Sequence, residues 1–382
     1  MIPKLTSKLP KLETSIFSKM SQMATETGAI NLSQGFPDFG VDPGLIKLMQ
    51  QSLEGSFNQY APMGGIFSLR EAIAEKTSRL YGASYHPETE ITLTAGATQA
   101  IYTAIASTVY AGDEVIIFKP AYDCYEPTVK AHGGIPVLLQ LEGPEFKINW
   151  EAFSRALSPR TRMVIINTPH NPSGTILKET DLKKLEEMLR PTNTLVLSDE
   201  VYEHLVFDGN THESACKYPG LKERSFICAS FGKTFHITGW KMGYCLAPSS
   251  LMEEFRKLHE FVVFSVNHPA QRALKAYLEE PSHYEGLGAF FQKKRDLFLE
   301  AVRGSRFRYT PAEGTYFQLL EYSGISEESD LSFAEYLTRE RGIASIPISV
   351  FNLERQDNCQ LRFCFAKTEE TLKRAGEILC RL

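Results

Sequence analysis

Residues 230–244 read SFGKTFHITGWKMGY, and the rest of the chain is interpreted from this stretch. It follows a short apolar run at residues 226–229, which predicts a buried strand that ends just before Ser230. A glycine precedes Lys233, a Thr-Gly-Trp turn follows, and a second cation, Lys241, comes next. A lysine in a tight, hydroxyl-rich loop at a strand end is suited to forming a Schiff base with an aldehyde.

The aldehyde cofactor that proteins hold through a lysine is pyridoxal phosphate. This chemistry makes Lys233 the candidate attachment point, with the Ser230 hydroxyl and the Lys241 ammonium as candidate phosphate ligands. The alternative is an ordinary surface lysine, because most lysines are solvated. A nucleotide-binding P-loop is excluded, because residues 226–231 contain no glycine.

The overall composition indicates a globular chain of 382 residues, with 43% hydrophobic and 23% charged residues. Two domains are expected at this length. The net charge of −5 argues against nucleic-acid binding, and no apolar stretch has the length of a membrane span. The N-terminal residues lack a continuous apolar core, so a secretory signal is not expected.

The seven cysteines are an odd number without a CxxC pair, which argues against a disulfide framework or a zinc site. Several of them lie inside apolar runs. We therefore expect reduced, buried thiols and a cytoplasmic protein without a metal site. The chain shows no internal repeat, low-complexity tract or clear linker.

From residue 91 onward, short apolar runs alternate with helical patterns, which predicts an α/β fold with a mainly parallel sheet. Strands are expected at residues 91–94, 114–118, 137–141, 163–166, 195–198 and 226–229, with an earlier brief strand at 30–32. Helices are expected at residues 16–23, 45–53, 69–81, 99–110 and 251–263. In such sheets, ligands bind outside the carboxyl ends of the strands.

Polar or aromatic groups follow several of these strand ends, namely Gly96, Thr98, Tyr122, Asn171, Asp199 and Tyr202. A small-residue turn that leads into a helix, as at residues 95–98, favours phosphate binding. Asp199 follows a buried strand, where an acid is costly without a cationic partner. A protonated pyridinium nitrogen is such a partner. The alternative is that Asp199 caps a following helix.

The C-terminal part predicts a second, smaller α+β unit. We expect helices at residues 284–302, 333–340 and 370–382, and strands starting at 314–317, at 343–346 and at 361–365. Arg362 lies on the last strand, where it can bind a carboxylate through two parallel hydrogen bonds. The alternative for Arg362 is a structural ion pair.

Eight blocks in this order carry a family resemblance: NLSQGFPDF, NQYAPMGG, TAGATQAIY, PAYDCYEP, NTPHNPSG, SDEVYEHL, SFGKTFHITGWKMGY and LRFCFAK. They resemble the class I pyridoxal-phosphate aminotransferases of fold type I, in the branch of kynurenine (glutamine transaminase K-like) and bacterial methionine aminotransferases. The resemblance runs from about residue 12 to the end. It implies a seven-stranded sheet sandwiched by helices. It also implies an N-terminal arm at 1–40 that contributes to the small domain, a large cofactor-binding domain at 41–280, and a small domain at 281–382.

The resemblance also implies a role for each matching position. Lys233 matches the Schiff-base lysine and proton carrier, and Asp199 matches the partner of the pyridinium nitrogen. The remaining cofactor contacts are Tyr202 and Asn171 at the phenolic oxygen, Tyr122 stacked on the ring, and Gly96, Ala97, Thr98, Ser230 and Lys241 around the phosphate. Tyr60 matches a tyrosine that reaches the phosphate of the neighbouring subunit, which implies a homodimer with shared sites. The contacts to the substrate carboxylate are Gly35, Asn171 and Arg362.

Three positions depart from the wider pattern. Lys241 stands where much of the class has arginine, although the kynurenine-like branch also has lysine. Ala97 replaces a larger or hydroxyl-bearing residue found in many relatives. Phe17 stands where some kynurenine-type relatives have tryptophan. Phe17, Tyr60 and Phe264 are the candidates for the side-chain pocket.

These features favour a ping-pong transaminase that moves the amino group of methionine, glutamine or an aromatic amino acid to a 2-oxo acid. An aromatic pocket suits sulfur-containing side chains. The alternative is a kynurenine–oxoglutarate aminotransferase with a cysteine-S-conjugate β-lyase side activity. A cofactor-binding regulator would need an attached DNA-binding domain, and a nicotinamide dehydrogenase would need a GxGxxG motif after a strand; the sequence offers neither.

Overall fold

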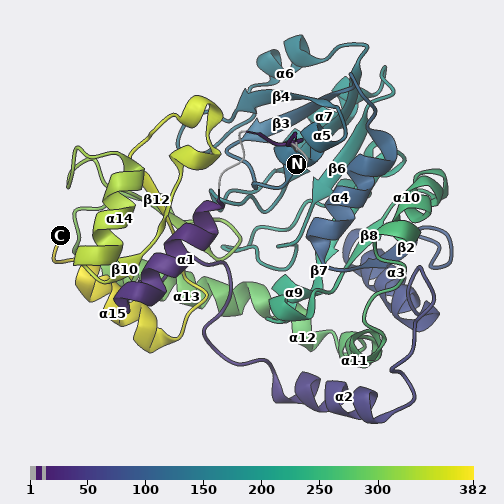
Figure 1. Cartoon of the computed structure of the whole chain (residues 1–382), viewed down its shortest axis with the longest axis horizontal. Helices are drawn as coiled ribbons and strands as arrows, with labels where there is room; N and C mark the ends of the chain where they lie inside the picture. Colours follow the sequence, from purple (N-terminus) through teal and green to yellow (C-terminus); the bar gives the residue numbers. More distant parts are fainter. Residues whose placement is uncertain (1–5, 11–13) are drawn as a thin grey trace, which may run out of the picture.

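The computed structural model describes residues 6–10 and 14–382, and its centre is a seven-stranded sheet (Figure 1). The strand order is β2-β8-β7-β6-β5-β3-β4. The strands are β2 (Ile91–Thr94), β3 (Glu114–Lys119), β4 (Ile135–Gln140), β5 (Thr161–Asn167), β6 (Leu195–Asp199), β7 (Ser225–Ser230) and β8 (Gly243–Leu246). Only β8 runs antiparallel to its neighbours in this sheet. The carboxyl ends of the other six strands therefore meet at one edge.

Both faces of the sheet are buried, because successive strand residues enter two different apolar clusters. In β3, Val115 and Ile117 pack into one cluster, while Ile116 and Phe118 pack into the other. The helices of this part are α2 (Pro43–Glu54), α3 (Phe67–Tyr81), α4 (Ala97–Thr108), α5 (Tyr125–Ala131), α6 (Trp150–Ala156), α7 (Glu179–Leu189), α8 (Pro219–Lys222), α9 (Phe231–Thr234), α10 (Ser249–Val262) and α11 (His268–Leu278). The predicted α/β architecture with a mainly parallel sheet is confirmed.

A smaller unit joins the two ends of the chain. Parallel β1 (Ile30–Asn31) and β10 (Ile343–Ala344) pair with each other, and β11 (Ile346–Pro347), β12 (Gln360–Cys364) and β9 (Phe317–Glu321) form an antiparallel sheet. Its helices are α1 (Ile16–Thr27), α13 (Leu287–Val302), α14 (Asp330–Glu340) and α15 (Glu369–Leu379), whereas the short α12 (Ser282–Glu285) contacts Arg79 and Tyr277 of the larger part. Figure 1 shows α1, in purple, beside the C-terminal elements in yellow-green, and α1 packs against α14. The domain limits at residues 40 and 280 stay a prediction.

Several expected elements differ in detail. The single helix predicted at residues 284–302 is two helices, α12 and α13, separated by Gly286. The strand predicted at 343–346 is also two elements, because β10 pairs with β1 whereas β11 pairs with β12. The strand expected to begin at 314–317 starts only at Phe317. β8 was not predicted from the sequence, and neither were α5, α6, α7 and α11.

All seven cysteines are free thiols, but Cys380 is exposed, so the expectation of uniform burial is wrong for that residue. Within residues 6–10 and 14–382, none of the helices combines the length and apolar character needed to cross a bilayer. Residues 1–5 and 11–13, at the start of the predicted N-terminal arm, lie outside the described part of the chain.

Candidate active site

A cavity of about 330 Å³ lies at the carboxyl ends of the parallel strands and is closed by residues of the smaller unit. We call it the active-site cavity. Every site residue predicted from the sequence lines it, except Tyr60 and Phe264. Its lining consists of Phe17, Gln34, Gly35, Phe36, Gly96, Ala97, Thr98, Ile101, Tyr122, Asn167, Asn171, Asp199, Val201, Tyr202, Ser230, Gly232, Lys233, Thr238, Lys241, Met242, Phe317 and Arg362.

Lys233 projects into this cavity from α9, a single helical turn that directly follows β7. The Ser230 hydroxyl oxygen caps the turn by accepting the Lys233 backbone N–H at 3.3 Å. The Lys233 Nζ atom donates to the Gly35 carbonyl oxygen at 2.9 Å. Burial of the amine lowers the pKa of Lys233 to about 8. The alternative of an ordinary solvated lysine is therefore wrong.

Asp199 ends β6 as a buried carboxyl group without a cationic partner. Its oxygens accept from the Tyr125 hydroxyl at 2.5 Å and from the Val201 N–H at 3.3 Å. In the described chain, no lysine, arginine or histidine lies within ion-pair distance of it. Burial raises the pKa of Asp199 to about 6. Turns rather than a helix follow Asp199, so the helix-cap alternative is wrong.

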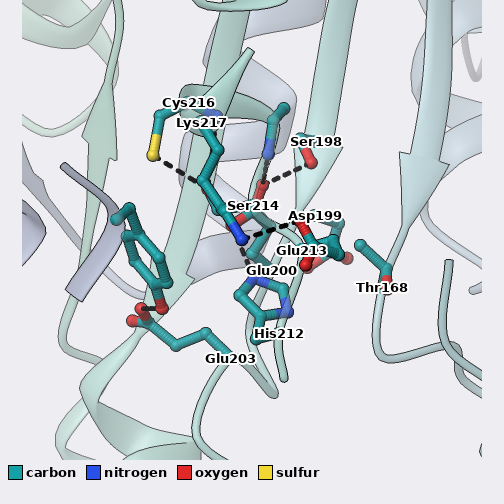
Figure 2. Close-up of polar contacts among 12 residues, drawn as sticks. Thr168, Ser198, Asp199, Glu200, Glu203, His212, Glu213, Ser214, Cys216 and Lys217 are labelled. Atoms are coloured by element: carbon teal, nitrogen blue, oxygen red, sulfur yellow. Dashed lines mark hydrogen bonds and ion pairs between the residues drawn. The ribbon is translucent and has the colours of Figure 1, made fainter. Parts of the chain in front are cut away.

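The residues after Asp199 have no regular structure, and the buried Glu200 fixes the start of this segment. Glu200 Oε1 accepts from the Ser198 hydroxyl at 2.7 Å and from the Ala215 N–H at 3.0 Å. His212 Nε2 lies 2.8 Å from Glu200 Oε2, and Figure 2 draws these two side chains together. These contacts hold the end of β6 in place without a helix or a further strand.

Glu203 fixes the other end of the same segment. It accepts from Lys76 Nζ and the Tyr81 hydroxyl at 2.6 Å each, and from the Tyr244 hydroxyl at 2.8 Å. Burial alone would raise the pKa of Glu203, but the charges of Lys76 and His204 hold it well below its usual value. Tyr202, which lines the active-site cavity, therefore lies between two hydrogen-bonded carboxylates, and Asp199 directly precedes the first of them.

The start of α4 forms one end of the active-site cavity. Gly96 precedes this twelve-residue helix with a φ of 80°, a conformation that favours glycine. A Cβ atom at Gly96 would lie 3.5 Å from Lys241 Nζ, so the ammonium group is close to the helix start. The free N–H groups of the first turn, the ammonium group and the nearby Ser230 hydroxyl together suit a phosphate.

Two tyrosines, Tyr122 and Tyr202, line the active-site cavity. The Tyr122 hydroxyl lies 3.5 Å from the Thr98 hydroxyl, at the start of α4. Burial raises the pKa values of Tyr122 and Tyr202 well above the usual value, so both phenols keep their protons at neutral pH. The exposed face of a phenol ring in a cavity wall can stack on a flat heterocycle.

Arg362 forms the opposite end of the active-site cavity. Its Nη1 donates to Asn171 Oδ1 at 2.7 Å and its Nη2 to the Ser33 carbonyl oxygen at 2.9 Å, while its buried Nε has no partner. The guanidinium lies 3.8 Å from the centre of the Phe317 ring. Among the described residues, no carboxylate forms an ion pair with Arg362, so the structural ion-pair alternative is wrong. Burial lowers the pKa of Arg362 to about 10, and a bound anion would offset this cost.

The side of the active-site cavity near α1 is aromatic. The Phe17 ring stacks on Phe351 at 5.6 Å, and its backbone oxygen accepts from Gln34 Nε2 at 3.0 Å. Phe36 also lines this side. The described lining contains only the cations Lys233, Lys241 and Arg362, which leaves none for a substrate side-chain carboxylate.

Tyr60 and Phe264 lie outside the active-site cavity of the single chain. Their rings meet edge to face with centres 5.1 Å apart, and Tyr60 is 81% exposed. Their predicted roles require a second copy of the chain and stay predictions.

Sequence reasoning missed several residues of this site. Tyr125 follows Tyr122 by three positions in PAYDCYEP, and Gln34 precedes Gly35, so both stood within quoted motifs. Tyr316 stood in a segment interpreted only as the start of a strand. Nothing local distinguishes these residues, because their partners Asp199, Phe17 and Gly35 are distant in the sequence.

The lysine at a strand end, the helix start and the buried arginine occur together in one class of enzyme. The family of class I and II aminotransferases matches residues 27–379, and the chain belongs to this family. It is 48% identical to the methionine aminotransferase of Escherichia coli over 377 residues, which are 98% of each protein. A solved Escherichia coli structure with an identified methionine aminotransferase function matches 100% of both chains with a TM-score of 0.97.

The kynurenine–oxoglutarate transaminase of Dictyostelium discoideum is a more distant relative. It is 33% identical over 408 residues, covering 96% of this chain and 94% of that protein. The predicted family, the fold type I architecture and transaminase activity are thereby confirmed.

Proposed function

We propose that this aminotransferase uses pyridoxal 5'-phosphate bound through Lys233 to move the amino group of methionine to a 2-oxo acid. Glutamine and aromatic amino acids are further proposed donors. The observation that carries the proposal is the pairing, in one cavity, of a lysine of lowered pKa with a buried carboxyl group that lacks a cation.

The described residues fit this cofactor. Asp199 is placed to hold a protonated ring nitrogen, which would supply the cation that the buried carboxyl lacks. The start of α4 at Gly96, Ala97 and Thr98, with Ser230 and Lys241, is proposed to hold the phosphate. Tyr122 would face its ring, and Tyr202 and Asn171 would hold its phenolic oxygen. The bound cofactor supplies an electron sink for the charge that develops at the substrate Cα.

The protein residues then bind the substrate and move one proton. Arg362 binds the substrate carboxylate beside Asn171 and Gly35, which orients the Cα–H bond. Lys233 Nζ would take the proton from the substrate Cα and hold it for its later return. Because the pKa of Lys233 is lowered to about 8, the amine is able to take up and release a proton near neutral pH.

The side-chain pocket supports methionine as the donor. Phe17 and Phe36 provide ring edges on which a thioether packs well. The described lining offers no free cation for a distal carboxylate, which disfavours aspartate. The similarity to the Escherichia coli methionine aminotransferase points to the same donor.

We also propose a homodimer with shared sites, in which Tyr60 and Phe264 of one copy enter the site of the other. The support is an exposed apolar patch that joins Tyr60 and Phe264 to Phe261 and Val262 at the end of α10; Phe261 is 86% exposed. Mixing Lys233→Ala chains with Tyr60→Ala chains tests this arrangement. Shared sites restore one complete site per hybrid dimer and regain activity, whereas separate sites leave the mixture inactive.

We place the enzyme in the cytoplasm. The support is the set of seven free cysteines, which suits a reducing compartment. Cys228 in β7, Cys245 in β8 and Cys364 in β12 are fully buried.

The alternative function is a kynurenine–oxoglutarate aminotransferase with β-lyase side activity, as the second relative suggests. Single half-reactions with methionine, glutamine, phenylalanine, kynurenine and aspartate, followed by absorbance, separate the two. We expect methionine to react fastest and aspartate slowest. A clear preference for kynurenine, or pyruvate and ammonia released from a cysteine S-conjugate without an acceptor, would favour the alternative.

A further inference from the structure

The Gly35 carbonyl oxygen accepts two hydrogen bonds inside the active-site cavity. Lys233 Nζ donates to it at 2.9 Å, and the Tyr316 hydroxyl donates to it at 2.5 Å. A carbonyl oxygen has two lone pairs, so these two donors use its full capacity. The oxygen is therefore the common partner of the lysine and of a buried phenol that the function proposed above does not use.

The backbone at Gly35 is pressed against the aromatic residues that lead into β9. A Cβ atom there would lie 2.8 Å from Phe317 Cζ and 3.5 Å from Tyr316 Cε2, so only glycine allows this approach. The rings of Tyr202 and Tyr316 also flank the lysine, with centres 5.9 and 5.6 Å from Lys233 Nζ. The loop, the phenol and the amine form one packed group.

We propose that Tyr316 is a positioning residue for Lys233. Its hydroxyl holds the Gly35 carbonyl in place, and that carbonyl in turn holds the free ε-amino group of Lys233 at a fixed point in the cavity. The inference rests on the proposed transamination, in which Lys233 is free while the substrate occupies the site. Tyr316 itself touches neither the proton nor the substrate.

The step that depends on this position is the proton transfer. The Cα–H bond breaks and the proton goes to the lone pair of Lys233 Nζ, while the bound cofactor would take up the electron pair left at Cα. A lysine that loses its fixed acceptor site spends less time in reach of Cα, so this step slows while binding of the substrate carboxylate at Arg362 is unaffected.

The Gly35 carbonyl oxygen also stabilises the protonated form of the amine. Without the phenol this acceptor is less well ordered, so the pKa of Lys233 falls further. Loss of the hydroxyl thus has a second, independent consequence in the cofactor-free chain. A merely structural role for Tyr316 predicts neither effect.

The test compares Tyr316→Phe with Tyr322→Phe. These tyrosines directly precede and follow β9; both are buried, and each hydroxyl donates to a backbone carbonyl, that of Tyr322 to Glu328 at 2.8 Å. Each variant holoenzyme is mixed rapidly with methionine or 2-deuterated methionine, and the loss of the visible cofactor band is timed. The rate at which each cofactor-free full chain binds pyridoxal phosphate is then measured as a function of pH.

For Tyr316→Phe, we expect a band loss about tenfold slower than in the wild type and a larger deuterium isotope effect. The methionine concentration that gives half the maximal rate should stay within about twofold, because Arg362 is untouched. The pH midpoint of cofactor binding by the cofactor-free chain should fall. Tyr322→Phe should match the wild type in all three measurements.

The inference is overturned if Tyr316→Phe keeps the wild-type rate and isotope effect, or if both variants lose rate alike. It is also overturned if the loss lies only in methionine binding. A wild-type chain that forms no visible band, or one whose band methionine leaves unchanged, instead refutes the proposed function on which the inference rests.

Discussion

Replacing Asp199 with asparagine is expected to stabilise the cofactor-free chain at neutral pH and to disable the enzyme. The carboxyl group is buried without a cation, and its polar partners are the Tyr125 hydroxyl and the Val201 N–H. An amide of the same shape removes the buried charge. It also removes the group proposed to keep the cofactor nitrogen protonated.

The magnitude follows from the pKa of Asp199. Burial raises it from 3.8 to about 6, so the ionised carboxylate costs the folded chain about 3 kcal/mol at 1.36 kcal/mol per pKa unit. Because the folded pKa is the higher one, this group's stabilisation is complete below pH 3.8 and is lost as the pH rises through about 6. Between pH 5 and pH 7.5 the wild-type chain should lose about 1.4 kcal/mol through Asp199 alone.

Urea unfolding of both cofactor-free chains at the two pH values measures this contribution. We expect Asp199→Asn to be the more stable chain at pH 7.5, by up to about 3 kcal/mol, and this advantage to shrink by about 1.4 kcal/mol at pH 5. Asp199→Asn holoenzyme should react with methionine more slowly by a factor on the order of 10² to 10³. An advantage that does not change with pH would refute the reasoning, as would a fully active variant.

Three further predictions concern other parts of the site. Arg362→Lys should raise the half-saturating methionine concentration by a factor on the order of 10², because a lysine lacks the planar guanidinium group that donates two parallel hydrogen bonds to a carboxylate. Steady-state kinetics would show an unchanged half-saturating concentration if the substrate carboxylate binds elsewhere. Gly82→Ala places a side chain in the left-handed helical region and should cost about 1 kcal/mol in the free energy of unfolding. Gly96→Ala should cost more, up to about 3 kcal/mol, because φ 80° with ψ 167° is a conformation that essentially only glycine adopts. Only Gly96→Ala should also weaken cofactor binding in an absorbance titration, because its Cβ atom would lie 3.5 Å from Lys241 Nζ, whereas nothing lies within 4 Å of a Cβ atom at Gly82. Equal cofactor affinities of the two variants would show that the phosphate does not bind at the start of α4. Cofactor capture by the cofactor-free chain should accelerate as the pH rises through about 8, where Lys233 becomes neutral; a rate that is flat with pH would contradict the pKa of Lys233.

Much of the sheet could be predicted because its strands are short apolar runs with clear ends. Residues 226–229 and 195–198 were expected strands, and β7 and β6 contain them. By contrast, β8 is a four-residue element next to the lysine loop, and no apolar alternation marks it. The division of the helix at residues 284–302 depends on one glycine that a helical pattern tolerates.

Part of the chemistry of the site could also be predicted from the sequence. Residues that follow strand ends, such as Asp199 and Lys233, meet at one sheet edge for topological reasons that a sequence reveals. The hydrogen bonds between residues distant in the sequence could not be predicted. Tyr316 and Gly35 are 281 positions apart, and only the assembled fold brings the phenol to that carbonyl.

The central claim is that Lys233 carries pyridoxal phosphate and exchanges it for an amino acid. The most direct test is the visible absorbance spectrum of the purified protein with this cofactor, recorded before and after methionine is added without an acceptor. The wild-type chain should show a yellow band that methionine bleaches, and Lys233→Ala should show no bleaching. A wild-type chain that stays colourless, or a Lys233→Ala chain that bleaches like the wild type, would contradict the claim.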